Sequence, residues 1–346
     1  MTDRPPMPRP RRPTIRDVAE RAGVSFKTVS RVVNAESGVR PEVASVVEQA
    51  INDLGYQRDD RARRLRQGAT TSGVIGFVLV DVSNPFFSSI LRGIEEVARR
   101  HDSLVLAGST DADLDREAQL VGAFAARRVD GLIVIASEQP SAPLRNELLH
   151  GTPVGFVDLE PKWPEFDLVR SDHEGGASLA TRHLIEHGHR DIAFVGDAPS
   201  TFSAALRRNG FLHEMARAGQ PVPADRVLNG SHEPEEWSDI IAEYLDGPGR
   251  PTALFTAQNF ITVGAAQALH RLGLHRRIAQ IGFDDVTLAA EIEPALSVVP
   301  QDPLMLGRRA ATRLFQRIAG TAGPAERQIL PTAVVARGSG EIRGPG

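Results

Sequence analysis

Residues 14–34 read TIRDVAERAGVSFKTVSRVVN and predict two short helices joined at Gly23. Apolar residues recur at helical spacing on both sides of this glycine, namely Ile15, Val18, Ala19 and Ala22 before it and Val29, Val32 and Val33 after it. Ser25 can cap the second helix. A third apolar stripe opens at Pro41 and ends at Gly55, so three helices can close a small core.

The second of these helices carries, opposite its valines, side chains that suit contact with nucleic acid. They are Phe26, Lys27, Ser30, Arg31 and Asn34. A helix-turn-helix places its second helix in the major groove of DNA, where Lys or Arg pairs with guanine and an apolar side chain touches the thymine methyl.

The distribution of charge along the chain agrees with a role of the first domain in binding DNA. Residues 1–68 hold 14 Lys and Arg against 9 Asp and Glu, a net charge of +5, so the rest of the chain must carry −9 for the whole to carry −4.

Composition limits the classes of protein to which the chain can belong. Its 346 residues predict at least two domains, and 41% hydrophobic with 24% charged residues is typical of a globular protein. Zero cysteines exclude disulfides, thiolate zinc sites and cysteine nucleophiles. Residues 1–16 lack the apolar core of a secretory signal, and no apolar run is long enough to span a membrane. We therefore expect a cytoplasmic protein.

From Gly73 onward, apolar runs of strand length alternate with helical patterns, as in VIGFVLV (residues 74–80), GLIVIA (131–136) and IAFVG (192–196). This rhythm predicts parallel βαβ units, and its restart near Leu179 predicts a second doubly wound subdomain. Two such sheets facing each other form a cleft for a small molecule beyond the carboxyl ends of their strands.

No pattern in the chain predicts catalysis, a metal or a cofactor. A G-x-S-x-G nucleophile elbow, a glycine-rich phosphate loop after a strand and paired carboxylates are all missing, so we expect no enzyme. Two interpretations of His183, His187 and His189 are open, a metal cluster or histidines on the surface at the end of a helix. We favour surface histidines, because no neighbouring carboxylate or cysteine completes a set of metal ligands.

The segment from Thr14 to Asn34, together with Tyr56 and ARRLRQG (residues 62–68), resembles the DNA-binding head of the LacI/GalR family of bacterial repressors. The resemblance implies a helix-turn-helix domain over residues 14–60, after a disordered Pro/Arg-rich tail of residues 1–13. The residues implied to read bases are Phe26, Lys27 and Arg31. The residues implied to contact phosphates and to position the helix are Thr14, Ser25, Thr28, Ser30 and Asn34.

The resemblance also implies a hinge helix and linker over residues 61–70. In the family this helix folds on DNA and pushes a leucine between central base steps in the minor groove, and Leu65, preceded by Ala62, matches that wedge. Residues 58–59, Arg-Asp, stand where the family usually has Pro-Asn, and Asp60 adds a carboxylate close to the phosphates. The register of the hinge is therefore left open.

The resemblance continues from SNPFF (residues 83–87) to LPTAVVARG (330–338) and implies a periplasmic-binding-protein-like core. The implied N-subdomain covers about 71–170 and 300–329, and the C-subdomain covers about 171–299 and 330–346. The implied effector contacts are Asn84, Phe86, Phe87, Asp158, Ser203, Arg207, His232, Gln258 and Asp284. Arg207 offers a planar fork of five donors and Asp284 a pair of acceptors, which together suit the vicinal hydroxyls of a sugar. Members that bind purines usually carry an Arg where this chain has Thr201, so a sugar or polyol is favoured over a purine.

The function implied is a ligand-responsive transcriptional regulator, a repressor, that binds a pseudo-palindromic operator in double-stranded DNA at the nucleoid. The final residues, RGSGEIRGPG (337–346), show no leucine heptads, so a homodimer is expected rather than a tetramer. The alternative is a solute-binding receptor without a role at DNA, since the body alone would resemble one. The head and the missing export signal favour the regulator. The effector, the operator and the direction of control stay open.

Overall fold

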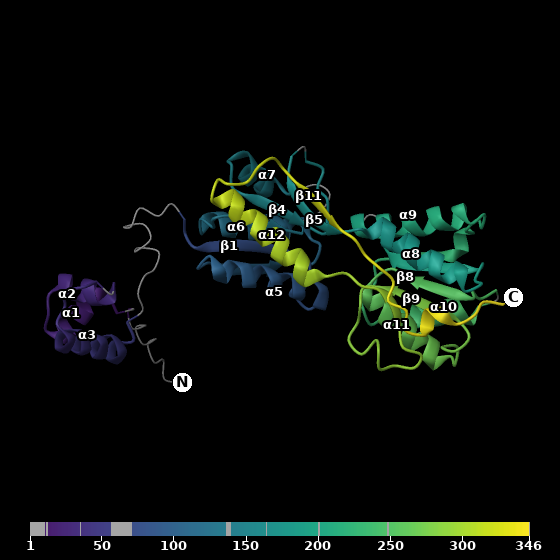
Figure 1. Cartoon of the computed structure of the whole chain (residues 1–346), viewed down its shortest axis with the longest axis horizontal. Helices are drawn as coiled ribbons and strands as arrows, with labels where there is room; N and C mark the ends of the chain where they lie inside the picture. Colours follow the sequence, from purple (N-terminus) through teal and green to yellow (C-terminus); the bar gives the residue numbers. More distant parts are fainter. Residues whose placement is uncertain are drawn as a thin grey trace, which may run out of the picture. The chain divides into compact units, whose positions relative to one another are not determined.

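The computed structural model describes residues 11, 13–34, 36–56, 71–135, 140–163, 165–199, 201–247 and 249–345. The chain divides into two compact units, Met1–Ser72 and Gly73–Gly346 (Figure 1). The predicted hinge, with Ala62 and Leu65, lies outside the described residues, as does most of the predicted tail. In the part of the chain that is described, no helix is long and apolar enough to cross a membrane.

The first unit contains the three predicted helices, α1 (Ile15–Ala22), α2 (Phe26–Val33) and α3 (Pro41–Leu54). The start of α1 is a reciprocal cap, in which the side chains of Thr14 and Asp17 each accept the backbone N–H of the other, and its end is Gly23 in the left-handed conformation. Ser25 caps α2 by accepting the backbone N–H of Thr28. One valine from each helix is fully buried at the centre of the core: Val18, Val29 and Val47.

The second unit contains two lobes, each built on a parallel β-sheet. Six described strands form the sheet of the N-lobe, and all neighbouring pairs in it are parallel. In spatial order they are β11 (Arg327–Leu330), β5 (Asp167–Ser171), β4 (Val154–Val157), β3 (Leu132–Val134), β1 (Val74–Leu79) and β2 (Leu104–Ser109). The helices of this lobe are α5 (Pro85–Arg100), α6 (Leu114–Ala126), α7 (Ala142–Leu149) and α12 (Pro303–Ile318).

The C-lobe repeats this plan with five described strands, again all parallel. In spatial order they are β10 (Ser297–Val299), β9 (Ala279–Phe283), β8 (Ala253–Thr256), β6 (Ile192–Asp197) and β7 (Val227–Gly230). Its α-helices are α8 (His173–Glu186), α9 (Phe202–Arg217), α10 (Trp237–Asp246) and α11 (Asn259–Arg271), with two short 3₁₀ turns at Ala224–Arg226 and Ser339–Glu341. Two doubly wound sheets that follow a small helical head in the sequence are the α/β architecture that the sequence predicted.

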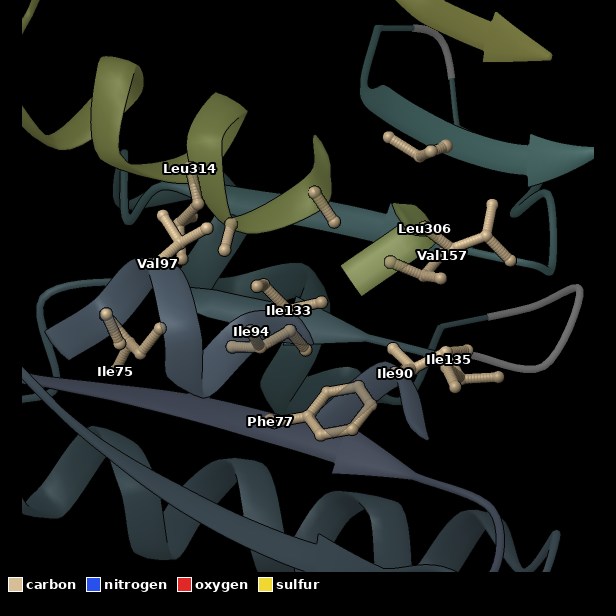
Figure 2. Packing of buried hydrophobic residues seen from close by; sticks show 14 of the residues in the cluster. Ile75, Phe77, Ile90, Ile94, Val97, Ile133, Ile135, Val157, Leu306 and Leu314 are labelled. Carbon is tan, nitrogen blue, oxygen red and sulfur yellow. The ribbon is translucent and has the colours of Figure 1, made fainter. Parts of the chain in front are cut away.

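One hydrophobic cluster of the N-lobe includes residues of α6 and α7, and the other lies between the sheet and the helix pair α5 and α12. Figure 2 shows side chains from both sources gathered there, among them Phe77 from β1 and Leu314 from α12. The two helices approach closely at Gly307, where an added Cβ atom would lie 2.1 Å from the carbonyl oxygen of Ile90. This contact holds α12 in the N-lobe, although α12 follows the strands of the C-lobe in sequence.

The chain passes between the lobes three times, after β5, after β10 and after β11. The first passage leads into α8 and the second leads back to α12. The third returns the chain to the C-lobe, where Val335 forms an antiparallel bridge with Val298. The carboxyl ends of the two sheets are therefore connected by three segments of chain.

The interpretation of all three clustered histidines as surface residues is wrong for His189, which is fully buried. Its Nδ1 lies 2.9 Å from the Thr252 hydroxyl and its Nε2 lies 2.8 Å from the carbonyl oxygen of Ile342. His183 forms a hydrogen bond with Glu341. The C-terminal segment thus covers this end of α8, which local spacing does not reveal. Within the described ranges, no group of three potential metal ligands comes together.

Candidate functional site

The carboxyl ends of strands from both lobes open onto one cavity of about 1000 Å³. The N-lobe lines it with residues that follow β1, β2, β3 and β4, and the C-lobe with residues that follow β6, β7, β8 and β9. This is the edge at which doubly wound sheets bind ligands. All nine residues predicted to contact an effector line the cavity: Asn84, Phe86, Phe87, Asp158, Ser203, Arg207, His232, Gln258 and Asp284.

Two packed helices of the C-lobe, α8 and α9, bring His173 and Arg207 together. They pack closely at Gly210, where an added Cβ atom would lie 2.2 Å from the carbonyl oxygen of Glu174. The hydroxyl of Ser178 also donates to the carbonyl of Gly210 at 3.1 Å. A larger side chain at position 210 would push the helices apart and move Arg207, which lies about one turn earlier on α9.

Arg207 is 4% exposed, and its guanidinium is held on several sides. Its Nη1 donates to the carbonyl of Ala257 at 2.7 Å, and its Nη2 donates to Nδ1 of His173 at 3.3 Å. The guanidinium lies 4.0 Å from the centre of the Phe283 ring, and Nη1 lies 4.0 Å from a carboxylate oxygen of Asp284. These hydrogen bonds use two of the five N–H donors of the guanidinium, and the buried Nε has no hydrogen-bond partner among the described residues.

His173 links Arg207 to the N-lobe. Its ring is fully buried, and Nε2 lies 3.2 Å from Oδ1 of Asp158, which follows β4. Burial lowers the pKa of His173, and the charge of Arg207 lowers it further, so the ring is neutral. Since Nδ1 accepts from Arg207, the proton of the neutral ring sits on Nε2 and faces Asp158. Burial by itself would raise the pKa of Asp158, but His173 and Arg207 lower it, so Asp158 is ionised.

Asp158 and Asp284 occupy matching positions in the two lobes. Each is the first residue after a strand, and each has the left-handed backbone that aspartate tolerates better than most residues, with φ of 66° and 73°. Gln301 donates to Oδ1 of Asp284 at 2.6 Å. Burial raises the pKa of Asp284, and burial also raises that of Asp197, which ends β6. A ligand in the cavity therefore meets acidic groups from both sheets.

A direct hydrogen bond joins the lobes at a second point of the cavity. The Nδ2 of Asn259 donates to Oδ1 of Asn84 at 2.8 Å, and both residues are 7% exposed. The same Oδ1 accepts the backbone N–H of Phe86 and so caps α5. The side-chain oxygen of Gln258, in contrast, caps α11 by accepting the N–H of Ile261 at 3.1 Å. Asn259, rather than Gln258, thus carries the amide that reaches the opposite lobe.

The aromatic part of the lining comes from both lobes. Phe86 and Phe87 lie in the first turn of α5, and their rings meet edge to face at 5.3 Å. His232 from the C-lobe rests edge-on against Trp237 at 4.9 Å. Ser203, near the start of α9, is 9% exposed. These rings offer apolar faces beside the polar groups.

The sequence prediction missed several residues that line or adjoin the cavity, among them His173, Asp197, Asn259 and Gln301. Asp197 directly follows the apolar run IAFVG (192–196), so its place at a strand end was visible in the sequence. His173 lies within SDHEGG (171–176), but its role depends on partners 15 and 34 positions away. Gln301 lies on the passage after β10, which local pattern does not place beside Asp284.

In the first unit, the residues predicted to read bases lie on the exposed face of α2. Phe26 is 46% exposed, and Lys27 and Arg31 are also exposed. Such an exposed phenylalanine among cations suits a contact with base edges. The Nε of Arg31 lies 3.8 Å from the carboxylate of Glu36, a weak ion pair that DNA can replace.

The predicted phosphate contacts surround this face, and most also stabilise the helices. Ser25 and Thr28 share a hydrogen bond of 2.8 Å between their hydroxyls at the start of α2. Asn34 donates to the Ser30 hydroxyl at 3.4 Å at the other end of the helix. Thr14 caps α1. These short polar side chains thus fix both ends of α2 and the start of α1.

Known proteins match both units. The profile described as bacterial regulatory proteins, lacI family, matches residues 14–59, and that of a periplasmic binding protein-like domain matches residues 181–340. The ribose operon repressor of Escherichia coli K12 is 34% identical over 331 residues, 94% of this chain and 99% of that protein. The repressor PurR of Pasteurella multocida is 32% identical over 310 residues, 88% of this chain and 92% of that protein. The crystal structure of the lac repressor dimer bound to operator and the anti-inducer ONPF has a TM-score of 0.80 at 28% identity, covering 95% and 99% of the two chains.

A helix-turn-helix head combined with a two-lobed ligand-binding body defines a DNA-binding transcriptional repressor that responds to a ligand. The chain belongs to the LacI family of bacterial regulatory proteins. This confirms the family, the fold class and the regulatory function predicted from the sequence, and it argues against a solute-binding receptor. The relatives are repressors rather than enzymes.

Proposed function

We propose that the effector of this repressor is a sugar or a related polyol bound in the cavity between the lobes. The observation that carries the proposal is the placement of one nearly buried guanidinium, Arg207, among the carboxylates of Asp158 and Asp284. Hydroxyl groups both donate and accept, so vicinal hydroxyls can satisfy a donor of Arg207 and a nearby carboxylate together. The exposed part of the Phe86 ring supports the apolar face of a sugar ring.

A purine is the alternative effector, because PurR proteins are among the relatives. A purine offers flat acceptor edges, which a guanidinium at position 201 would serve. This chain has Thr201 there, at the start of α9, and its side chain makes no cap hydrogen bond. The donor that the resemblance associates with purines is therefore missing, which favours the sugar.

For DNA, we propose that Phe26, Lys27 and Arg31 read base edges while Thr14, Ser25, Thr28, Ser30 and Asn34 contact phosphates or position the helix. A homodimer would place one head in each half-site of a pseudo-palindromic operator. The predicted hinge residues Ala62 and Leu65 would enter the minor groove between the half-sites. We propose that the protein binds its operator in the cytoplasm, at the nucleoid.

Effector binding controls DNA binding if it favours one arrangement of the two lobes. The Asn84–Asn259 and Asp158–His173 contacts join the lobes at the cavity. A ligand in the cavity can therefore change the relative stability of two arrangements of the lobes. Coupling of about 1–3 kcal/mol between two such sites, a factor of roughly 5–150 in affinity, is typical of allosteric proteins.

One experiment tests these proposals together. The purified protein selects bound fragments from random DNA, and the selected sequence is titrated at several salt concentrations with sugars and with hypoxanthine and guanine. A palindrome whose affinity changes with one sugar supports the proposal. A response to a purine alone overturns the sugar effector, and selection of no DNA sequence overturns the proposed base-reading residues.

A further inference from the structure

The cavity is strongly acidic, and this property limits the charge of its ligand. Eight of its described lining residues are carboxylates, and Arg207 is the only Lys or Arg among them. The N-lobe contributes Asp111, Asp113 and Glu117 after β2, and the C-lobe contributes Glu233 after β7. Carboxylates therefore surround a ligand from both lobes.

The positive charge of Arg207 is already shared with other groups. Two of its nitrogens donate to Ala257 and His173, and its positive charge already balances Asp284 at 4.0 Å. The two hydrogen bonds use two of the five N–H donors of the guanidinium. Because Asp284 already shares the positive charge, the remaining donors suit a hydroxyl oxygen better than a second anion.

Helix N-termini also attract anions, but three of those at the cavity are already occupied. The side chains of Asn84, Asp113 and Gln258 each accept a backbone N–H from the first turn of α5, α6 and α11, respectively. The start of α9 has no side-chain cap, yet it follows Asp197 by only a few residues. An anion at α9 would thus share the cavity with that carboxylate.

The unsatisfied atoms at the cavity demand a ligand that can donate hydrogen bonds. The buried Oε1 of Gln301 has no partner among the described residues, and the carboxylates add further acceptors. A hydroxyl group donates to such acceptors and can also accept from Arg207, whereas a phosphate dianion only accepts. Burial raises the pKa of Asp197, the charge of Arg207 lowers it, and the charge of Asp284 raises it.

We propose that this cavity selects an uncharged, hydroxyl-rich ligand and rejects the phosphorylated or carboxylated derivative of the same sugar. The inference rests on the proposed sugar effector and names the charge class of that ligand. The regulator then senses a sugar before a kinase reaction adds a phosphate to it.

The test uses the full-length protein and matched pairs of ligands. Calorimetry measures the affinity for common aldopentoses and aldohexoses, for their phosphates and for their uronic acids, at about 50 and 500 mM salt. We expect the neutral sugar that binds to exceed its phosphate by at least about 10-fold, a ratio that falls at high salt because charges are screened. The variants Glu233→Gln and Asp197→Asn should reduce this ratio several-fold. Glu243→Gln, an exposed carboxylate on α10 outside the cavity, should leave the ratio unchanged.

The possible outcomes distinguish a failure of the charge selection from a failure of the proposed sugar effector. Binding of a phosphate or uronic acid as tightly as its parent sugar overturns the charge selection and leaves the sugar effector intact. Equal ratios in the cavity variants and in Glu243→Gln also overturn it, because the lining carboxylates would then not cause the rejection. If no sugar of either kind binds, the proposed effector class fails, and the charge selection fails with it.

Discussion

The Nε2 of His173 lies 3.2 Å from Oδ1 of Asp158, so the first residue of α8 in the C-lobe contacts the residue that follows β4 in the N-lobe. The other ring nitrogen of His173 accepts from Arg207. Three buried side chains thus form a series of contacts, from Arg207 to His173 at 3.3 Å and from His173 to Asp158 at 3.2 Å. Any ligand group that contacts Asp158 or Arg207 acts on a contact between the lobes.

Replacing His173 tests this series of contacts. His173→Ala leaves a buried guanidinium nitrogen and a buried carboxylate without a partner, which costs about 1–3 kcal/mol. We expect effector affinity to fall by about 10-fold or more and the unfolding temperature to drop. His173→Gln, whose amide both donates and accepts, should recover part of the affinity. His213→Ala, at an exposed position on α9, is the control, and affinities equal to the control would contradict the role.

The hydrogen bond between Asn84 and Asn259 leads to a second prediction. Asn259→Ala removes the bond, while Asn259→Asp keeps the size but directs a carboxylate at the Asn84 oxygen, whose orientation the Phe86 N–H fixes. Both variants should weaken the effector response of operator binding by about 5-fold, with Asp at least as harmful as Ala. Dose–response curves on an operator fragment measure this, with Asn146→Ala on α7 as the control. A milder effect of Asp than of Ala would mean that the Asn84 side chain is free to turn.

The sequence predicted those helices and strands whose own residues show a local pattern, such as an apolar run or a helix cap next to an apolar stripe. The strands β1, β3, β6 and β9 are runs of apolar residues buried on both faces, and α1 and α2 carry caps next to their apolar stripes. β5 reads DLVRS and carries no such signal. Its Asp167 is 5% exposed because Arg313 and Arg317 of α12 bind it, and that pairing spans about 150 positions. Strands stabilised in this way cannot be found from local periodicity.

The site residues likewise divide into those that the sequence predicted and those that depend on contacts between distant parts of the chain. The nine predicted lining residues came from a family resemblance that fixes positions along the chain, and all nine line one cavity. Sequence could not tell which of two adjacent amides, Gln258 or Asn259, turns toward the other lobe. That choice depends on which side chain caps α11, since only one of them can hold the N–H of Ile261. His173 likewise acquires its role from partners that the fold supplies.

Replacing Arg31 tests the DNA-contacting face of α2. A bidentate contact of arginine with guanine contributes about 1–3 kcal/mol to discrimination between bases. Arg31→Ala should therefore weaken binding to the selected operator by about 5- to 150-fold and leave binding to random DNA nearly unchanged. Fluorescence anisotropy on both duplexes measures the ratio. Arg21→Ala on α1, which removes an exposed pair with Asp53, is the matched control. Equal losses on both duplexes would assign Arg31 to phosphate contact.

The far ends of α8 and α9 are joined by Glu214, and this pairing predicts how stability depends on pH. Both nitrogens of the Arg182 fork donate to the Glu214 carboxylate, at 2.9 and 3.1 Å, and Arg217 binds the same group. Hydrogen bonds from Arg182 and Arg217 lower the pKa of Glu214 to about 2 from an ordinary value of 4.5. A lowered carboxyl pKa stabilises the folded state fully above pH 4.5, and this contribution is lost as the pH falls toward 2.

Glu214→Gln should accordingly lower the free energy of unfolding at pH 7 by roughly 2 kcal/mol, since Arg182 and Arg217 are half exposed and solvent weakens the pair. Between pH 4.5 and 3 the difference between the variant and the natural chain should shrink, because the natural chain loses the ionised carboxylate there. Chemical denaturation at a series of pH values measures both curves. The same helices carry His173 and Arg207, so loosening them should also weaken effector binding at pH 7. A constant difference across that pH range would show that packing of Glu214, and not its charge, joins the two helices.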